Sequence, residues 1–329
     1  MKGHKILSFY QDAKKLIKGE MVIPRFISLW LTTSCDLSCS YCFFNDKNKE
    51  KKFADTNKVK KFIDEIVDLG VESLELSGGG EPTIHPDCFD IIEYAHKKGL
   101  KVGLLTNGFK FDFERMLLLS YVRFGIDSIT PKQFNYIKGG TNNRFDILLY
   151  NIRKLLSLRK DVEFPHIGMK FMVNQQNFTC IDGMVSLSFS TGVDYCHFKG
   201  THSDKNKLTD LQILGVNLNI AKKKETYPDF VFGSVLKCNA KTKCFMAPIH
   251  AVVTPFGDVL NCCYFYSSDK VIGNAFNSNF EDIWFSEHHR NVLNSTQISD
   301  CNKVDCRFSY YNNEMKEVLE QNKYDISFI

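Results

Sequence analysis

The sequence predicts an α/β protein in which a partial (βα)6 TIM-like barrel is followed by a small C-terminal domain. Strand-like and helix-like segments alternate from residue 26 to residue 222, a pattern typical of parallel strands joined by helical crossovers. The 329-residue chain has 43% hydrophobic and 24% charged residues, which suits one large domain and one small one. Its twelve cysteines are bunched, and six of them follow residue 237. These features favour a chain with a barrel core and a metal-stabilised end.

The first strand is expected at 26–34, a run of β-branched and aromatic residues that ends at Cys35. Gly70 and Gly99 end the first two predicted helices. Further strands are expected at 72–77, 101–106, 121–126, 166–173 and 193–198, and helices at 59–69, 88–98, 115–119, 145–158, 179–189 and 210–222. Right-handed crossovers bring the loops after all six strands to one rim of the sheet, where a βα barrel places its chemistry.

The alternating pattern ends near residue 235. We therefore divide the chain into an N-terminal leader segment (1–23), a barrel core (24–235) and a small C-terminal domain with a tail (236–329). After residue 236 the chain is irregular and rich in cysteine, as expected where a metal centre replaces a large hydrophobic core.

The charge balance argues against nucleic acid as a partner, because 42 basic and 38 acidic residues leave a net charge of only +4 and no basic stripe with interleaved aromatic residues. The N-terminal segment lacks the apolar core and cleavage site of a secretory signal, and no stretch of eighteen uncharged apolar residues follows. We expect a cytoplasmic protein without a membrane span. In that compartment clustered thiols indicate metal or redox chemistry in preference to disulfides.

Three cysteines lie within eight residues directly after the first predicted strand: Cys35, Cys39 and Cys42 in CDLSCSYC. Random placement of twelve cysteines would give roughly 0.02 such triplets in a chain of this length, so the cluster calls for a chemical explanation. Three thiolates holding a four-iron cluster leave one iron open to a ligand. The alternative is a structural zinc loop with a distant fourth ligand.

Gly78 to Pro82, in the sequence GGGEP, follows the second predicted strand. The glycines allow the backbone to approach a ligand closely, and Glu81 offers an acceptor for an ammonium group. A phosphate-binding loop is the competing interpretation, but no Gly-Lys-Ser/Thr follows. The position behind the cysteine loop favours a ligand contact over a simple turn.

The C-x3-C-x2-C pattern, with Tyr41 before its last cysteine, resembles the radical S-adenosylmethionine (SAM) superfamily over residues 24–235. The resemblance implies that a 4Fe-4S cluster on the three cysteines binds SAM and splits it reductively to a 5′-deoxyadenosyl radical, with an electron donor such as flavodoxin or ferredoxin. It also implies a list of SAM contacts: Tyr41, Gly79, Gly80, Glu81 and Pro82. Many members carry Ser where this chain has Gly125, which leaves one SAM hydrogen bond to Ser128 or to water.

Weaker signals come from polar residues on the later strands. Thr106, Asn107 and Asp127 end two of these strands, where they can reach the SAM ribose or a substrate. Lys170 interrupts an apolar strand and is expected either to pair with the SAM carboxylate or to be exposed at a sheet edge. His197 is expected to be a satisfied structural histidine.

The C-terminal cysteines form a second pattern. The spacing from Cys244 through Gly257 to Cys262 resembles the opening of the auxiliary-cluster domains called SPASM and twitch, and a hairpin turning at 255–258 would return Cys262 toward Cys244. The resemblance implies a second 4Fe-4S cluster, with Cys301 and Cys306 as further ligands. Spacing does not choose between Cys262 and Cys263, and a four-cysteine zinc ribbon is the alternative.

The resemblance implies abstraction of a hydrogen atom from a substrate, expected to be a ribosomally made peptide, leading to oxidation, cross-linking or epimerisation. A separate leader-peptide carrier protein is then expected. Cys238 is a candidate hydrogen donor, although a buried inert thiol is the default interpretation for a single spare cysteine. The alternatives are a small-molecule substrate such as an amino sugar and, in another class, a zinc-stabilised non-enzymatic binding protein.

Overall fold

The computed structural model describes residues 10–44, 50–140, 143–159, 163–201, 206–235, 244–264 and 266–296, together with Cys306, Phe308, Asn312 and Met315. Cys238 and Cys301, on which two of the site predictions rest, lie outside the described residues, as does the leader segment before Tyr10. None of the described helices is both long and apolar enough to cross a membrane.

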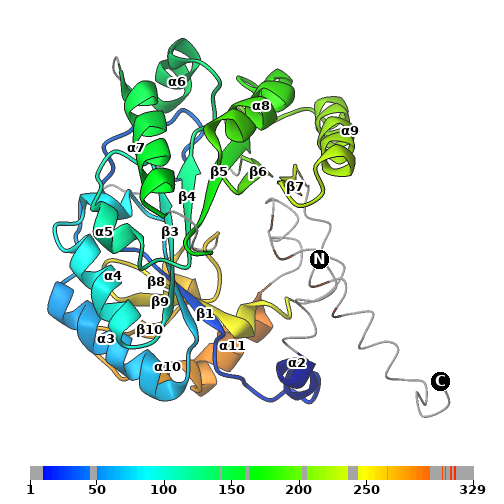
Figure 1. The fold of residues 1–329 in the computed structure, drawn as a ribbon. Helices are drawn as coiled ribbons and strands as arrows, with labels where there is room; N and C mark the ends of the chain where they lie inside the picture. The colour runs from blue at the N-terminus through cyan, green and yellow to red at the C-terminus, as the bar shows by residue number, and fades with distance from the viewer. Residues whose placement is uncertain are drawn as a thin grey trace.

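The described strands form one sheet in the order β10-β9-β8-β1-β2-β3-β4-β5-β6-β7 (Figure 1). Eight neighbouring strands, β8 and β1 to β7, pair in parallel, and β9 and β10 add an antiparallel edge. The strands are Phe26–Leu29, Ser73–Leu76, Lys101–Thr106, Tyr121–Gly125, His166–Val173, Tyr195–Gly200, Val231–Ser234, His250–Val253, Asp258–Leu260 and Val271–Asn274. The six predicted strands are confirmed, and β7 and β8 extend the parallel part beyond them.

Helices cover one face of this sheet (Figure 1). They are α2 Tyr10–Ile17, α3 Thr56–Leu69, α4 Cys88–Lys97, α5 Phe113–Met116, α6 Pro131–Lys138, α7 Arg144–Arg159, α8 Ile181–Thr191, α9 Asp210–Thr226, α10 Phe280–Trp284 and α11 Glu287–Ser295. Helix α6 was not predicted from the sequence, although Thr130 caps it and Pro131 opens it, both ordinary helix-start signals.

Along the strands, successive side chains point to opposite faces of the sheet, and the two faces differ in character. Residues such as Ile27, Leu104 and Phe124 are fully buried in one large apolar core beneath the helices. The other face of the sheet is polar and tightly packed. Beta carbons added at Gly103 and Gly168 would lie 2.3 Å from the Tyr121 ring and 2.1 Å from the Tyr195 ring, so these glycines make room for rings of the neighbouring strands. We call this surface the inner face.

The C-terminal part shares the sheet of the barrel. His250 of β8 pairs with Phe26 of β1, and the predicted hairpin is confirmed as the antiparallel pair β8 and β9. Gly257 turns this hairpin with φ +89°, a conformation that favours glycine. Trp284 of α10 is fully buried and donates from Nε1 to Val22 O at 2.8 Å. The boundary at residue 236 stays a prediction, and the strands after it add to the sheet that begins before it.

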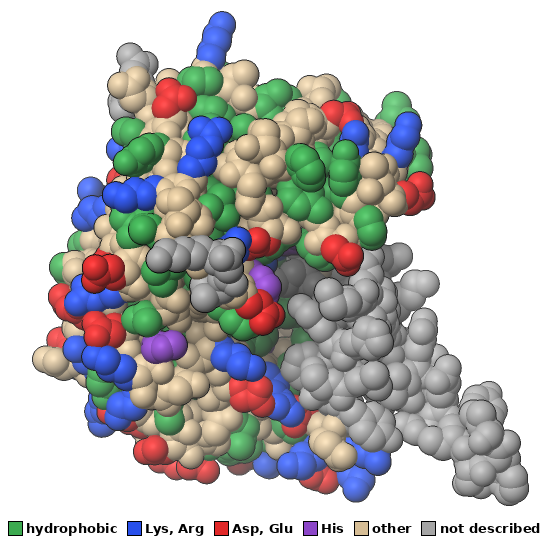
Figure 2. Space-filling view, viewed as in Figure 1, with side chains coloured by type: hydrophobic (Ala, Val, Ile, Leu, Met, Phe, Trp, Pro, Cys, Tyr) green, Lys and Arg blue, Asp and Glu red, His purple; other side chains and the backbone are tan. Residues whose placement is uncertain are grey.

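Figure 2 shows acidic and basic side chains interspersed over the visible face of the molecule. On the described helices, apolar side chains that are more than half exposed include Leu211, Leu214 and Leu218 of α9 and Phe189 of α8.

Candidate functional site

The cysteine loop, residues 34–44, follows β1 and is docked on the carboxyl end of α6. Ser38 N donates to Lys138 O at 3.1 Å, and Ser40 N donates to Ile137 O at 2.9 Å. Gly139 ends α6 in the left-handed conformation, and a beta carbon there would lie 2.0 Å from Ser38 Oγ. The missed helix therefore supports the loop that carries Cys35, Cys39 and Cys42.

Asp127, at the end of β4, holds the same loop through its side chain. Its Oδ2 accepts a hydrogen bond from the Tyr41 hydroxyl and lies 2.5 Å from Lys138 Nζ. Its Oδ1 accepts from Met172 N at 2.5 Å. Burial lowers the pKa of Lys138, but the charges of Asp127 and Cys39 and the hydrogen bond with Asp127 act together against it, and the pKa is raised overall. Both carboxylate oxygens are engaged, so a contact of Asp127 with a ribose stays a prediction.

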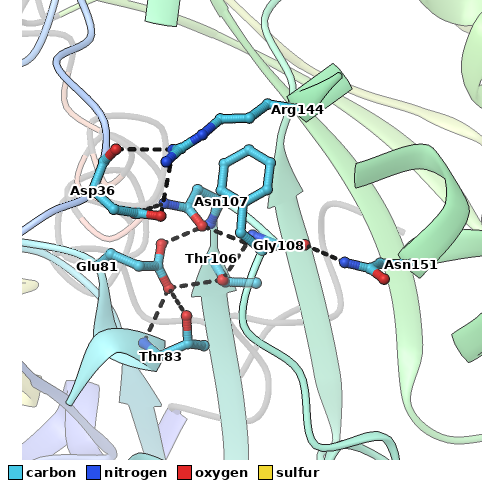
Figure 3. Close-up of polar contacts among 9 residues, drawn as sticks. Asp36, Glu81, Thr83, Thr106, Asn107, Gly108, Arg144 and Asn151 are labelled. Atoms are coloured by element: carbon cyan, nitrogen blue, oxygen red, sulfur yellow. Dashed lines mark hydrogen bonds and ion pairs between the residues drawn. The ribbon is translucent and has the colours of Figure 1, made fainter. Parts of the chain in front are cut away.

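Glu81 closes the GGGEP loop onto β3 with hydrogen bonds at both carboxylate oxygens (Figure 3). Oε1 accepts from Thr83 N at 3.1 Å, Thr83 Oγ1 at 2.7 Å and Thr106 Oγ1 at 2.7 Å, and Oε2 accepts from Asn107 N at 2.7 Å. These hydrogen bonds lower the pKa of Glu81, but burial has the larger effect and the pKa is raised overall. With two lone pairs per oxygen, one position on Oε2 is left for an ammonium donor.

Asp36 links the cysteine loop to this network (Figure 3). Its Oδ1 accepts from Asn107 Nδ2 at 2.6 Å, and its carbonyl oxygen accepts from Arg144 at 2.9 Å. Asn107 thus touches both the cysteine loop and Glu81. The structure brings Cys35, Glu81, Thr106 and Asn107 together at the carboxyl ends of β1 to β3, as the sequence predicted.

Gly80 touches the cysteine loop so closely that no larger residue fits. A beta carbon there would lie 2.0 Å from Ser34 O, the atom that accepts from Glu81 N at 2.8 Å. We expect Gly80→Ala to lower the free energy of unfolding by about 2 kcal/mol, because backbone and not a movable side chain blocks the space. Urea unfolding measures the change. The matched control is Gly215→Ala in α9, where nothing lies within 4 Å and alanine should stabilise by about 0.5–1 kcal/mol. Equal stability of the two variants would contradict the prediction.

The thiols of the cysteine loop lie close enough that the charge of one affects the pKa of another. Burial raises the pKa of Cys35 to about 12, and the charges of Glu81 and Cys39 add to the effect. Burial also raises the pKa of Cys39, with Lys138 opposing and Cys42 adding to it. Three thiols on one anchored loop fit a four-iron cluster with one open iron. Among the described side chains, no three of the Cys, His, Asp and Glu type converge as they would around a single metal ion.

The C-terminal cysteines form a second group. Burial is the main cause that raises the pKa of Cys244, and the charge of Cys306 adds to it. The pKa of Cys262 is raised mainly by its hydrogen bond with Cys263 and by burial, and the charge of Cys306 contributes as well. Cys263 instead packs with the apolar cluster around Trp30. The charge of Cys306 thus reaches Cys262, and the choice between Cys262 and Cys263 as a cluster ligand stays a prediction.

Lys170 lies on the inner face of β5, between β4 and β6, so the prediction of an exposed sheet edge is wrong. Burial lowers its pKa to about 7, and Lys199 and Arg123 add to this effect. His197 pairs with Lys170 in the strand register, and burial and these cations hold its pKa well below its usual range. His197 Nδ1 is buried with no hydrogen-bond partner among the described residues, so the prediction of a satisfied histidine is wrong for this atom.

The pKa of Lys170 makes the stability of the protein depend on pH. Between pH 7 and 10.5 the unfolded chain binds more protons at this lysine than the folded one, so its contribution to stability rises with pH. We expect Lys170→Met to stabilise the fold by about 2 kcal/mol more at pH 6 than at pH 10, because the buried charge is present only at the lower pH. Urea unfolding at both pH values tests this. The exposed Lys222→Met is the control, and the same effect at both pH values would refute the prediction.

The sequence analysis missed several residues of the site: Asp36, Arg123, Lys138, Arg144 and Lys199. Arg123 is a charged residue that alternates with apolar ones in the predicted strand 121–126, the same signal that identified Lys170, whereas Lys199 lies one residue beyond the predicted strand 193–198. Gly125 lies beneath Lys138, with 3.3 Å from an added beta carbon to Nζ, so glycine there leaves room for the ion pair with Asp127.

Two family models match the chain. That of the radical SAM superfamily matches residues 31–175, and that of SPASM, an iron-sulfur cluster-binding domain, matches residues 244–307. The first range contains the cysteine and GGGEP loops, and the second contains Cys244, Cys262 and Cys306. Fold and thiol groups thus define an α/β iron-sulfur protein. The chain belongs to the radical SAM superfamily and carries a C-terminal SPASM domain, for which the cofactors are SAM, a 4Fe-4S cluster and auxiliary iron-sulfur clusters.

The relatives include proteins of different chemistry. Fe-coproporphyrin III synthase of Methanosarcina barkeri is 28% identical over 190 residues, 55% of this chain and 43% of that protein. The antilisterial bacteriocin subtilosin biosynthesis protein AlbA of Bacillus subtilis is 24% identical over 312 residues, 89% of this chain and 67% of that protein. The fold is similar to that of Streptococcus suis SuiB bound to its precursor peptide SuiA, with a TM-score of 0.70 and 16% identity over 95% of this chain and 78% of that one. The chain thus spans less than half the length of one curated relative.

Proposed function

We propose that the chain is a radical SAM enzyme that modifies a peptide through abstraction of a hydrogen atom. Bound SAM and its 4Fe-4S cluster would supply the one-electron chemistry that breaks an unactivated C–H bond. The observation that carries the proposal is the joint anchoring of the cysteine loop and the GGGEP loop, through Glu81 N to Ser34 O and Asn107 to Asp36, at the rim formed by β1 to β3.

Cys35, Cys39 and Cys42 would hold the catalytic cluster. Gly79, Gly80, Pro82 and Tyr41 would line the SAM site, and Glu81 would accept one hydrogen bond from the SAM ammonium group at Oε2. Thr106 and Asn107 hold Glu81 in place for this contact. Asp127 orients Tyr41 and, through it, the cysteine loop.

Cys244, Cys262 and Cys306 would hold the auxiliary cluster, with Cys301 as a fourth ligand. Asn312 Nδ2 donates to Cys244 Sγ at 3.5 Å, and Phe308 N donates to Cys306 Sγ at 3.4 Å. Hydrogen bonds of this kind stabilise the thiolate form that a cluster requires. Cys238 stays a candidate hydrogen donor for a reaction that ends in epimerisation.

The peptide substrate is supported by the relatives. AlbA is named for the biosynthesis of a bacteriocin, and SuiB has been seen with a precursor peptide. An electron donor such as flavodoxin or ferredoxin, and a separate carrier for a leader peptide, would complete such a system in the cytoplasm.

The experiment is anaerobic reconstitution followed by iron and sulfide analysis and a SAM cleavage assay. About eight irons per chain and reductant-dependent 5′-deoxyadenosine are expected. Bound zinc without iron would support the scaffold alternative, and eight irons without SAM cleavage would refute the enzyme. Incubation with short peptides encoded beside this chain's gene then tests the substrate. Modification of an amino sugar and of none of the peptides would overturn the peptide assignment.

A further inference from the structure

A group of basic side chains lies on the inner face of three adjacent strands. Lys170 of β5 pairs in register with His197 of β6, and Lys199 lies two residues beyond His197. Arg123 of β4 pairs with Gly168, two residues before Lys170. Side chains two residues apart on a strand share a face, so these four point to the same side of the sheet. The pKa values of Lys170 and His197 are both lowered by burial and by the charges of Arg123 and Lys199, which places all four groups in one electrostatic environment.

Two of these groups are left without a hydrogen-bond partner among the described residues. Lys170 forms neither a hydrogen bond nor an ion pair with any described side chain, and His197 Nδ1 is buried without a partner. Lys170 is half-buried, and a largely desolvated cation without a counter-ion is costly, as is a buried nitrogen without a partner. Such a pair is expected where a ligand supplies the missing contacts.

The acidic groups nearest to this basic group are already engaged. Asp127 is held by Lys138, by Tyr41 and by Met172 N. Glu75 of β2 accepts from Ser28 Oγ at 3.1 Å, Ser77 Oγ at 3.0 Å and Tyr121 OH at 2.5 Å. Neither carboxylate forms an ion pair with Lys170 in the described part of the chain.

Arg123 is fixed rigidly within this group. Its guanidinium lies 5.4 Å from the centroids of both the Tyr121 and Tyr195 rings, and its Nε donates to Tyr195 OH at 3.2 Å. The ring positions depend on Gly103 and Gly168, which have no side chains to occupy that space. The chain thus holds a permanent cation on the inner face, preorganised before any ligand arrives.

Lys199 connects the basic group to the C-terminal part. Its Nζ donates to Tyr264 OH at 2.8 Å, one residue after Cys263. The cysteine and GGGEP loops are tied to the carboxyl ends of β1 to β3, whereas the basic group occupies β4 to β6 and reaches the segment of the auxiliary cysteines. A substrate bound between the SAM site and that segment would meet these side chains.

From this arrangement we propose that Arg123, Lys170, His197 and Lys199 form a binding site for a carboxylate of the substrate. The inference rests on the proposed function and deepens it, because it names the substrate class: a peptide with a Glu or Asp side chain, or a free C-terminal carboxylate, beside the residue to be modified. An acidic oxygen there receives hydrogen bonds from Lys170 and neutralises the excess positive charge.

The test is equilibrium dialysis of labelled peptides against the reconstituted, SAM-saturated protein. The probes are Ac-Gly-Gly-Glu-Gly-Gly-NH2, its Gln counterpart, and Ac-(Gly)5 with a free C-terminal carboxylate. We expect at least one of the two carboxylate peptides to bind about tenfold more tightly than the Gln peptide, and which one does so tells a side-chain carboxylate from a terminal one. Lys170→Met and Lys199→Met should each remove most of the preference, and Lys222→Met, which makes the same charge change on an exposed part of α9, should retain it.

Two outcomes would overturn the proposal. One is equal binding of all three peptides. The other is a tenfold loss of SAM affinity in Lys170→Met with an unchanged peptide preference, since the group would then serve the SAM carboxylate, as the sequence analysis expected for Lys170. Because Lys170→Gln removes the same charge while keeping a polar side chain, it guards against misfolding of the Met variant. Dialysis needs no turnover, so a chain that cleaves no SAM refutes the proposed function without deciding the carboxylate site.

Discussion

Replacing Cys35, Cys39 and Cys42 together by alanine is expected to abolish SAM cleavage and to leave about half of the iron. The three thiols lie in one loop, whereas Cys244, Cys262 and Cys306 form a separate group near Asn312 and Phe308. Loss of the reactive centre should reduce 5′-deoxyadenosine formation by about three orders of magnitude or more, equivalent to at least about 4 kcal/mol of activation free energy. Chromatographic product analysis and iron analysis of one preparation measure both quantities.

A matched control for this variant is Cys180→Ala. Cys180 is half-buried in the short helix before α8 and accepts a hydrogen bond from Gln133 Nε2 at 3.3 Å, and it belongs to neither of the two thiol groups. It should retain full iron and full SAM cleavage. If the triple variant lost all of its iron, the idea of two independent clusters would fail.

The second large effect is expected at Lys138. Its ammonium group is buried and lies 2.5 Å from Asp127 Oδ2, so Lys138→Met leaves a buried carboxylate without its cation. Removing one partner of a buried ion pair costs about 3–5 kcal/mol. Urea unfolding of the metal-free chain should show this loss, and iron uptake should fall as well, because Asp127 also holds Tyr41 of the cysteine loop.

Two further variants decide whether the pair itself is responsible. The double change Asp127→Asn with Lys138→Met removes both charges and should recover most of the lost stability. Lys97→Met breaks an exposed pair with Glu93 on α4 and should cost less than about 1 kcal/mol. A double variant as unstable as Lys138→Met alone would show that packing, and not charge, dominates at this position.

Much of the fold follows from local patterns. The strands at 101–106 and 166–173 are observed with the predicted bounds, because a short, mostly apolar run is a signal carried by a few neighbouring residues. The strand β7 and the parallel pairing of β8 with β1 were missed. A strand of four residues carries little periodic signal, and partners far apart in the sequence leave no mark on local composition.

The candidate site, too, could be predicted only in part. Motif spacing identified the cysteine loop and Glu81, but it predicted contacts only to an external ligand. The structure adds that Glu81 is held by Thr83, Thr106 and Asn107, so one residue can serve both the loop and a ligand. Of the basic group on the inner face, the sequence analysis named Lys170 and His197 but did not connect them, because its members belong to different strands that the register brings together.

The pairing of β8 with β1 has a consequence for how the chain matures. Ser28 Oγ lies 3.0 Å from His250 Nε2, and the two residues are 222 positions apart in the sequence. During synthesis from the N-terminus, one edge of β1 therefore stays uncovered until almost the whole sheet has been made. Contacts of such high sequence separation slow folding and prolong exposure to aggregation. Synthesis of the last third of the polypeptide is thus required before the edge of β1 is covered and the nascent barrel is protected from aggregation with other chains. This protection precedes any insertion of metal.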